Sequence, residues 1–341
     1  MNDTRGGMEA EFREAPAVVQ RQAQALRAPV AELLARIRSK PPEFVVTCAR
    51  GSSAHAATFG KHLIERHLGL PVGAFAPNIA TIYGQRLQLN GQLFVTVSQS
   101  GRSDDLVESV AMAKAAGALT VAIVNDTESP LAKTSDIVLP MAAGPEVSVA
   151  ATKTFVASLA VLLHVTTEWT NDDALRAATE RLPEQLAAAT ALDWSAALNE
   201  MADARSLVTI GRGPTLAIAR EAALKLKETC NLHAEAFSGA EFLHGPVALV
   251  ETSYPILLLM PTDQAATGLR ELAADLRGKG ASVFVTDEKT AGGLPALEPD
   301  HPDADAVCLI QSFYALAVRL AQQRGTDADV PRHLRKVTRT R

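Results

Sequence analysis

The strongest constraint on the fold is an internal repeat. The segment CARGSSAHAATFGKHLIERHLGLPVGAF, residues 48–75, aligns without a gap with IGRGPTLAIAREAALKLKETCNLHAEAF, residues 210–237, at a shift of 162 positions. A second stretch, LVESVAMAKAAG at 106–117, aligns with LRELAADLRGKG at 269–280 at a shift of 163. A repeat of this length predicts two copies of one folded unit in a pseudo-twofold arrangement, unlike the short periods of solenoid proteins.

Each copy alternates strand-like and helical patterns. In the first copy the apolar runs FVVTC (44–48), LFVTVS (93–98) and LTVAIV (119–124) are each followed by a helical pattern. Strands that alternate with helices indicate a parallel sheet with helices on both faces. The sequence therefore predicts an α/β fold with two similar subdomains.

The length of the chain agrees with two domains. At 341 residues the chain exceeds one ordinary core. We predict these segments: an N-terminal helical segment at 1–38, a first subdomain at 39–172, a helical linker at 173–195, a second subdomain at 196–330 and a tail at 331–341.

Composition excludes several classes of protein. A net charge of -5 gives no electrostatic footprint for nucleic acid. Cys48, Cys230 and Cys308 show no CxxC spacing, so we expect reduced, buried thiols. The N-terminus is polar, and the longest apolar run, near 155–163, is shorter than the roughly 18 residues of a membrane span. We predict a cytoplasmic protein that binds neither nucleic acid nor membrane.

The first copy carries a polar loop, VSQSGRS, between a predicted strand and an amphipathic helix. In an open parallel sheet, ligands collect beyond the carboxyl ends of the strands, and a helix that starts there offers backbone N–H groups to an anion. Ser98, Gln99, Ser100 and Ser103 would add donors without bulk, and Gly101 lets the backbone approach closely. This loop therefore suits phosphate.

The same loop also fits a simple helix cap. In that interpretation Ser103 is the N-cap residue, while Asp104 and Asp105 favour the positive end of the helix dipole. The loop alone leaves both interpretations open. The second copy reads MPTDQ where the first reads VSQSG, so only the first copy has the serine-rich pattern.

A charged row lies on one predicted helix, EAALKLKE. Glu221, Lys225 and Glu228 follow each other at intervals of four and three, which puts all three on one helical face. From spacing alone, an exposed row of ion pairs is the ordinary explanation. Glu241 and His244 have the spacing of a metal pair, but no second pair exists among the scattered histidines, so we predict no metal.

Several motifs together resemble one family. These are ARGSSAHA, VSQSGRS, EVSVAATKTF, REAALKLKETCNLHAEAFSGAEFLHGPVAL and VPRHLRKV, and with EFREAPAVV they span the chain from about residue 11 to 337. The chain resembles the sugar isomerase (SIS) family, and within it the isomerase half of glucosamine-6-phosphate synthase. The resemblance implies two flavodoxin-like, three-layer subdomains. The glutaminase domain of the synthase has no counterpart in this sequence, so we expect no ammonia release from glutamine.

The resemblance implies a set of residues that bind the substrate. Ser98, Gln99, Ser100 and Ser103 match phosphate-binding positions, and the sugar-contacting positions are Ser52, Ser53, Val149, Ala151 and Lys225. Two positions depart from the family pattern. Ala151 replaces a serine, which removes one hydrogen bond to the sugar, and Arg102 replaces an acidic residue, so we expect it either near the phosphate or in solvent.

The resemblance also implies three catalytic residues. Glu228 matches the glutamate that moves a proton between C1 and C2, a task that suits a carboxylate. His244 matches the acid/base that opens the sugar ring, and it would reach the site of a neighbouring subunit in a homodimer. Lys336 matches a lysine that forms a Schiff base with the open-chain ketose. A basic tail is otherwise an ordinary solvated end, and Arg335 and His333 depart from the family pattern.

These residues together predict an enzyme that acts on a phosphosugar. It would convert glucosamine 6-phosphate and water to fructose 6-phosphate and ammonia, as the SIS-type glucosamine-6-phosphate deaminases do, without a cofactor. Other reactions fit the same residues: ammonia-dependent synthesis of glucosamine 6-phosphate, deamination of galactosamine 6-phosphate, or deglycation of a fructosamine 6-phosphate. A protein that only senses a sugar phosphate is a further alternative, although it would not need Glu228, His244 and Lys336 together.

Overall fold

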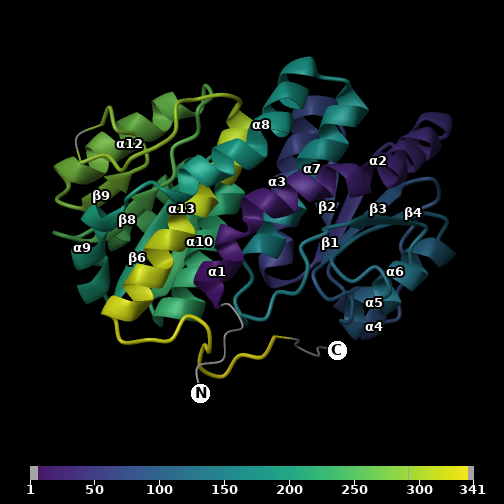
Figure 1. The fold of residues 1–341 in the computed structure, drawn as a ribbon, viewed down its shortest axis with the longest axis horizontal. Coiled ribbons are helices and arrows are strands. Elements are labelled where there is room, and N and C mark those ends of the chain that lie inside the picture. The colour runs from purple at the N-terminus through teal and green to yellow at the C-terminus, as the bar shows by residue number, and fades with distance from the viewer. Residues whose placement is uncertain (1–6, 291, 337–341) are drawn as a thin grey trace. The chain divides into compact units, whose positions relative to one another are not determined.

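The computed structural model describes residues 7–290 and 292–336, which form two compact units (Figure 1). The five-stranded unit takes residues 17–146, 153–179 and 335–336 of this part of the chain; the four-stranded unit takes 7–16, 147–152, 180–290 and 292–334. Each unit contains one parallel sheet, so the predicted α/β class is confirmed. The domain boundaries that we drew from the sequence stay predictions.

The five-stranded unit follows the predicted alternation. Its strands are β1 (Val45–Ala49), β2 (Val72–Ala74), β3 (Leu93–Ser98), β4 (Leu119–Val124) and β5 (Ile137–Pro140). Its helices are α2 (Ala15–Ser39, except its first two residues), α3 (Gly51–Leu68), α4 (Asn78–Thr81), α5 (Asp104–Ala115), α6 (Pro130–Thr134) and α7 (Lys153–Thr170). The sheet order is β2-β1-β3-β4-β5 and every pairing is parallel. This is the strand order of flavodoxin-like folds.

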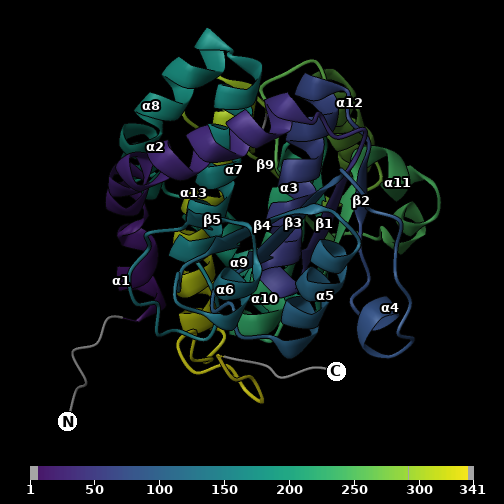
Figure 2. The same ribbon diagram turned by 90° about the vertical axis from the view of Figure 1, so that its right-hand side faces the viewer.

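Helices cover both faces of this sheet (Figure 2). One face packs on α5 and α6, whose Leu106, Val110 and Leu131 share a buried cluster with Phe94 of β3. The opposite face carries α3, which packs against the almost completely buried α7. Every residue of β3 is buried. Near-continuous apolar runs are expected for strands covered on both faces, and this explains why the sequence displayed them clearly.

The four-stranded unit repeats the pattern with one strand fewer. Its strands are β6 (Ser206–Gly211), β7 (His233–Ser238), β8 (Pro255–Leu258) and β9 (Ser282–Val285), in the parallel order β7-β6-β8-β9. Its helices are α1 (Met8–Arg13), α8 (Asp173–Thr190, from residue 180), η1 (Ser195–Ala197), α9 (Leu198–Asp203), α10 (Thr215–Cys230), α11 (Gly239–Leu243), η2 (Pro246–Leu249), α12 (Ala266–Gly278) and α13 (Pro302–Gln323).

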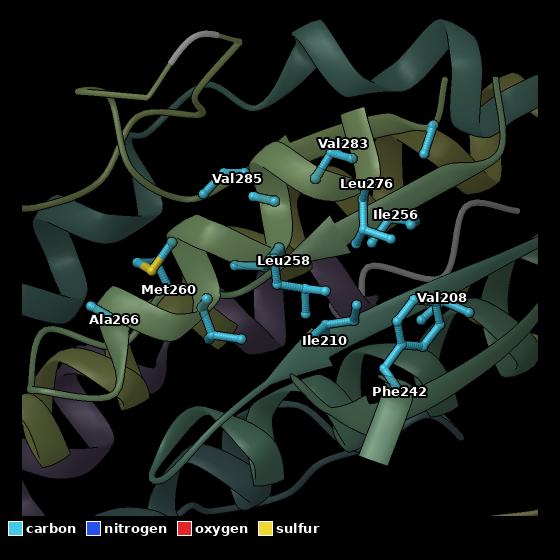
Figure 3. Close-up of a cluster of buried hydrophobic side chains, with 14 residues drawn as sticks. Val208, Ile210, Phe242, Ile256, Leu258, Met260, Ala266, Leu276, Val283 and Val285 are labelled. Carbon is cyan, nitrogen blue, oxygen red and sulfur yellow. The ribbon is translucent and has the colours of Figure 1, made fainter. Parts of the chain in front are cut away.

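A layer of aliphatic side chains holds α12 on this sheet (Figure 3). Val208, Ile210, Ile256 and Leu258 come from the strands, and Leu276 comes from α12. All five are buried. Burial of such a side chain contributes about 1.5–3 kcal/mol, so this layer is a major source of the unit's stability.

The strand pairings refine the internal repeat. β1 pairs with β3 as β6 pairs with β8, and the equivalent residues are 162 positions apart through Thr96, which corresponds to Leu258. The shift becomes 163 by β9. The extra residue of the second copy therefore lies between Leu258 and β9. At either shift the second copy has no serine at these positions, since Ser98 corresponds to Met260 or Pro261 and Ser100 to Thr262 or Asp263.

Cys48, Cys230 and Cys308 are free and buried, as the sequence predicted. Burial raises the pKa of Cys48 to about 12 and that of Cys230 to about 11. Within residues 7–290 and 292–336, one helix, α13, is long and apolar enough to cross a membrane, but 83% of its most apolar window is buried inside the protein. This burial is typical of a core helix, and α13 packs against α10.

Candidate active site

The VSQSGRS loop lies where strand order favours a ligand. Crossovers leave β1 and β3 toward opposite edges of the five-stranded sheet, and a parallel sheet binds ligands beyond the carboxyl ends of the strands at such a point. Ser98 ends β3, and Ser52 and Ser53 lie in the first turn of α3, directly after β1. The structure therefore brings both predicted serine groups to one edge of one sheet.

Local hydrogen bonds within the loop fix its shape. The buried Ser98 Oγ accepts a hydrogen bond from the Gly101 N–H at 3.2 Å, and Ser100 Oγ accepts one from the Arg102 N–H at 3.3 Å. The Gln99 carbonyl oxygen accepts one from the Asn125 N–H at 3.2 Å. The loop is therefore tied both to itself and to the chain that follows β4.

Ser103 occupies the N-cap position of α5, but its side chain makes no capping hydrogen bond. The capping interpretation is thus correct in position and wrong about the bond. Asp105 is buried and accepts hydrogen bonds from the Arg50 guanidinium at 2.9 and 3.1 Å. Arg102 is exposed and pairs with Asp126 at 2.8 Å, and this hydrogen bond holds the pKa of Asp126 below its ordinary value. Arg102 therefore forms an ion pair on the surface of the unit. The sequence did not predict this ion pair.

Gly101 is expected to be sensitive to substitution, since its φ is +61° and an added Cβ would lie 2.1 Å from Ser129 Oγ. Gly84 is a matched control, because it has the same φ but nothing within 4 Å of the added Cβ. We expect Gly101→Ala to destabilise the protein by about 2–4 kcal/mol and to weaken phosphosugar binding, whereas Gly84→Ala costs about 1–2 kcal/mol. Urea unfolding and calorimetric titration with fructose 6-phosphate measure both effects. Equal losses in the two variants would contradict a tightly packed loop.

The charged row on α10 is buried and not an exposed surface row. Glu221 is fully buried and Lys225 is 1% exposed, whereas the side chain of Glu228 remains 21% exposed. Lys225 Nζ lies 3.4 Å from Glu221 Oε1 and donates a hydrogen bond to Glu228 Oε2. Burial alone would lower the pKa of Lys225, but the two carboxylates outweigh it and raise this pKa above its ordinary value. Glu228 is thus a carboxylate held by a buried ammonium at the edge of solvent.

Val149 and Ala151 are half-buried and lie in the segment 147–152, which belongs to the four-stranded unit. The buried Glu11 of α1 anchors this segment, because its carboxylate accepts hydrogen bonds from the backbone N–H groups of Val147 and Ser148, the latter at 3.2 Å. Sequence analysis missed Glu11, although it lies inside the EFREAPAVV motif.

His244 follows α11 and is exposed, and its backbone N–H bonds to the Glu241 carbonyl oxygen. Among the described residues, no group of three or more His, Cys, Asp or Glu side chains could hold a metal. Lys336 lies in the five-stranded unit, and its Nζ is 2.9 Å from Oε2 of Glu146, a carboxylate with no exposed surface.

The predicted site residues fall into two sets. Ser52, Ser53, Ser98, Gln99, Ser100, Ser103 and Lys336 belong to the five-stranded unit, and Val149, Ala151, Lys225, Glu228 and His244 belong to the four-stranded unit. Within each unit the structure gives the geometry described above. A single site that combines both sets stays a prediction, as do the individual roles.

Comparison with known proteins agrees with this double α/β architecture. The SIS domain family matches residues 42–167 and 200–291. The chain therefore belongs to the SIS (sugar isomerase) family. It is 33% identical over 316 residues to the isomerizing glutamine--fructose-6-phosphate aminotransferase of Caulobacter vibrioides, covering 86% of this chain and 51% of that protein. The chain spans about half the length of the curated relatives it matches.

Solved structures show the same fold over nearly the whole chain. A protein from Silicibacter pomeroyi assigned as a phosphosugar isomerase is 44% identical, with a TM-score of 0.90, covering 94% of this chain and 99% of that one. The C-terminal domain of glucosamine-fructose-6-phosphate aminotransferase from Francisella tularensis is 26% identical, with a TM-score of 0.84, covering 97% and 100%.

Proposed function

We propose that this protein is a phosphosugar deaminase and isomerase that converts glucosamine 6-phosphate and water to fructose 6-phosphate and ammonia. The observation that carries the proposal is the arrangement on α10. A buried ammonium, Lys225, lies between a buried carboxylate, Glu221, and a carboxylate with access to solvent, Glu228. A charge buried at this cost is rarely kept for stability alone, and a fixed carboxylate is the group that an aldose–ketose shift requires.

The reaction follows from the chemistry of these groups. His244 opens the pyranose, which exposes the C1 aldehyde. Glu228 removes the proton from C2 and returns a proton to C1, which leaves an imine at C2. Water hydrolyses this imine to the ketone and ammonia. Alternatively, the Lys336 amine adds to the imine and expels ammonia, which forms a Schiff base that water then hydrolyses to the ketone and the free lysine. Each step is a proton transfer or the addition of water or an amine, so the balance needs no redox partner.

The phosphate would bind at the VSQSGRS loop. Support comes from its position beyond β3, next to the loop that follows β1, and from the Ser103 hydroxyl, which makes no capping bond. Such a loop at a helix start suits an anion. We propose that the reaction needs no cofactor, since the amine and the enediol carry the chemistry.

We infer that the enzyme works as a homodimer in which His244 serves the partner's site. Two apolar side chains near this histidine in the sequence are exposed: Leu243, directly before it, is 53% exposed, and Leu249, in η2, is 50% exposed. Exposed apolar groups beside a catalytic side chain suit an interface with a second copy. Analytical ultracentrifugation tests the assembly, and a monomer with full activity would contradict it.

The decisive test is ammonia release, coupled to glutamate dehydrogenase, from glucosamine 6-phosphate, galactosamine 6-phosphate and unphosphorylated glucosamine in parallel. Release from glucosamine 6-phosphate alone is expected. Release from galactosamine 6-phosphate instead would mean that the proposed reaction is correct but that the substrate is a different sugar phosphate. No release from any of the three would overturn the proposal, and fructosamine 6-phosphate and then binding without turnover would be tested next.

A further inference from the structure

Glu146 is a buried carboxylate for which the proposed reaction has no step. It follows β5 by six residues, and its side chain has no exposed surface. Three donors surround it: the Thr154 N–H at 3.1 Å, the Thr154 hydroxyl at 2.7 Å and Lys336 Nζ at 2.9 Å. Burial of a carboxylate is costly unless it is paired and hydrogen-bonded, and these contacts offset that cost.

Hydrogen bonds connect the VSQSGRS loop with the segment that leads into Glu146, inside the five-stranded unit. The Asn125 N–H bonds to the Gln99 carbonyl oxygen at 3.2 Å. The Asn125 side chain then holds the segment before Glu146, because its Nδ2 donates to the Gly144 carbonyl oxygen at 2.8 Å and its Oδ1 accepts from the Ala143 N–H at 2.9 Å. Glu146 is thus attached to the same edge of the sheet as the predicted phosphate loop.

The ion pair with Glu146 also restrains Lys336, which belongs to the C-terminal segment. Terminal residues are usually poorly ordered unless something ties them down. Lys336 has only 24% of its side chain exposed, and its partner is 190 residues away in sequence. We propose that Glu146 is a positioning residue that holds the Lys336 amine at the carboxyl edge of the five-stranded sheet. The functional part of this inference rests on the proposed role of Lys336.

A simpler role for Glu146 must be distinguished from this one. Thr154 is the second residue of α7, so Glu146 could serve only to bond an N–H group of that helix's first turn. Glutamine at this position keeps a carbonyl oxygen for Thr154 but loses the charge that attracts an ammonium. Glu146→Gln therefore separates the two roles: a pure helix cap survives the change, and the hold on Lys336 does not.

The first measurement needs no substrate. Endoproteinase Lys-C cleaves after lysine, so its attack after Lys336 under native conditions reports how often that side chain leaves Glu146. We expect Glu146→Gln to accelerate this cleavage, followed by intact mass, by about tenfold or more. The matched control is Glu32→Gln, which removes an exposed carboxylate paired with Arg36 on α2 and should leave the rate unchanged. Equal cleavage rates in wild type and Glu146→Gln would overturn the proposal.

The second measurement addresses catalysis. If ammonia release is observed in the wild type, Glu146→Gln should lower kcat while KM changes little, and Glu146→Asp should restore part of kcat. An unchanged kcat would overturn the positioning role even if Lys-C cleavage is faster. If the wild type releases no ammonia, the proposed function fails, whereas the Lys-C result still decides whether Glu146 holds Lys336.

A second variant covers the case in which Glu146→Gln does not fold. Thr154→Val removes the hydroxyl that orients the Glu146 carboxylate at 2.7 Å and keeps the backbone N–H bond. We expect Lys-C to cleave this variant faster than the wild type. Wild-type cleavage in a folded Thr154→Val protein would show that the carboxylate does not govern Lys336.

Discussion

Replacement of Glu228 by glutamine is expected to lower the rate of ammonia release from glucosamine 6-phosphate by about 10²–10⁴-fold. Glutamine keeps the size of the side chain and an acceptor for Lys225, which also retains the Glu221 carboxylate 3.4 Å away. It cannot, however, take a proton from C2. The glutamate dehydrogenase assay measures the rate, and thermal unfolding should show a native-like protein.

The control for this prediction is Glu271→Gln, which removes an exposed glutamate from α12 of the same unit. It should retain the wild-type rate. A Glu228→Gln enzyme that works as fast as the wild type would remove Glu228 from the chemistry and leave the buried α10 row as a structural feature only.

The order of strands and helices could be predicted because local patterns of apolar residues indicate it. β1, β3 and β4 coincide with the apolar runs at 44–48, 93–98 and 119–124 to within one residue. These strands are buried on both faces, so their composition differs sharply from that of the flanking turns. β5 was less visible: it has only four residues, and two of them are half-buried.

The charged row on α10 shows that a local sequence pattern does not predict burial. Spacing correctly placed Glu221, Lys225 and Glu228 on one face, but an exposed row and a buried row have the same spacing. Burial depends on the rest of the unit, where α13 packs against α10. The family resemblance, and not the spacing, favoured a functional role for this row over an ordinary exposed row of ion pairs.

Glu11 and Glu146 could not be predicted from spacing at all. Each is a single carboxylate whose partners lie far away in sequence: Glu11 binds N–H groups 136 and 137 residues on, and Glu146 binds Lys336. No period or short motif marks such a contact. The partner of Arg102 could not be predicted for the same reason, since Asp126 belongs to the loop after the next strand.

Replacement of Lys225 by methionine is expected to cost about 3–5 kcal/mol of stability at pH 7, because it leaves the fully buried Glu221 without the ammonium 3.4 Å away. The loss should depend on pH. The pKa of Lys225 is raised in the folded protein, so its stabilising contribution is complete below the unfolded-state pKa of about 10.4 and is lost as pH rises through the folded-state pKa. The difference in the free energy of unfolding between wild type and Lys225→Met should therefore become smaller at strongly alkaline pH. Urea unfolding at pH 7 and above 10 measures both quantities.

Lys227→Met is the matched control, because Lys227 lies on the same helix but is exposed and donates a hydrogen bond to the Ala234 carbonyl oxygen at 2.9 Å. It should cost less than about 1 kcal/mol. The double variant Glu221→Gln with Lys225→Met should regain part of the loss, since the buried charge is removed together with its partner. A Lys225→Met protein as stable as Lys227→Met would mean that Glu221 does not depend on this lysine. The buried charge on α10 would then no longer support the proposed function.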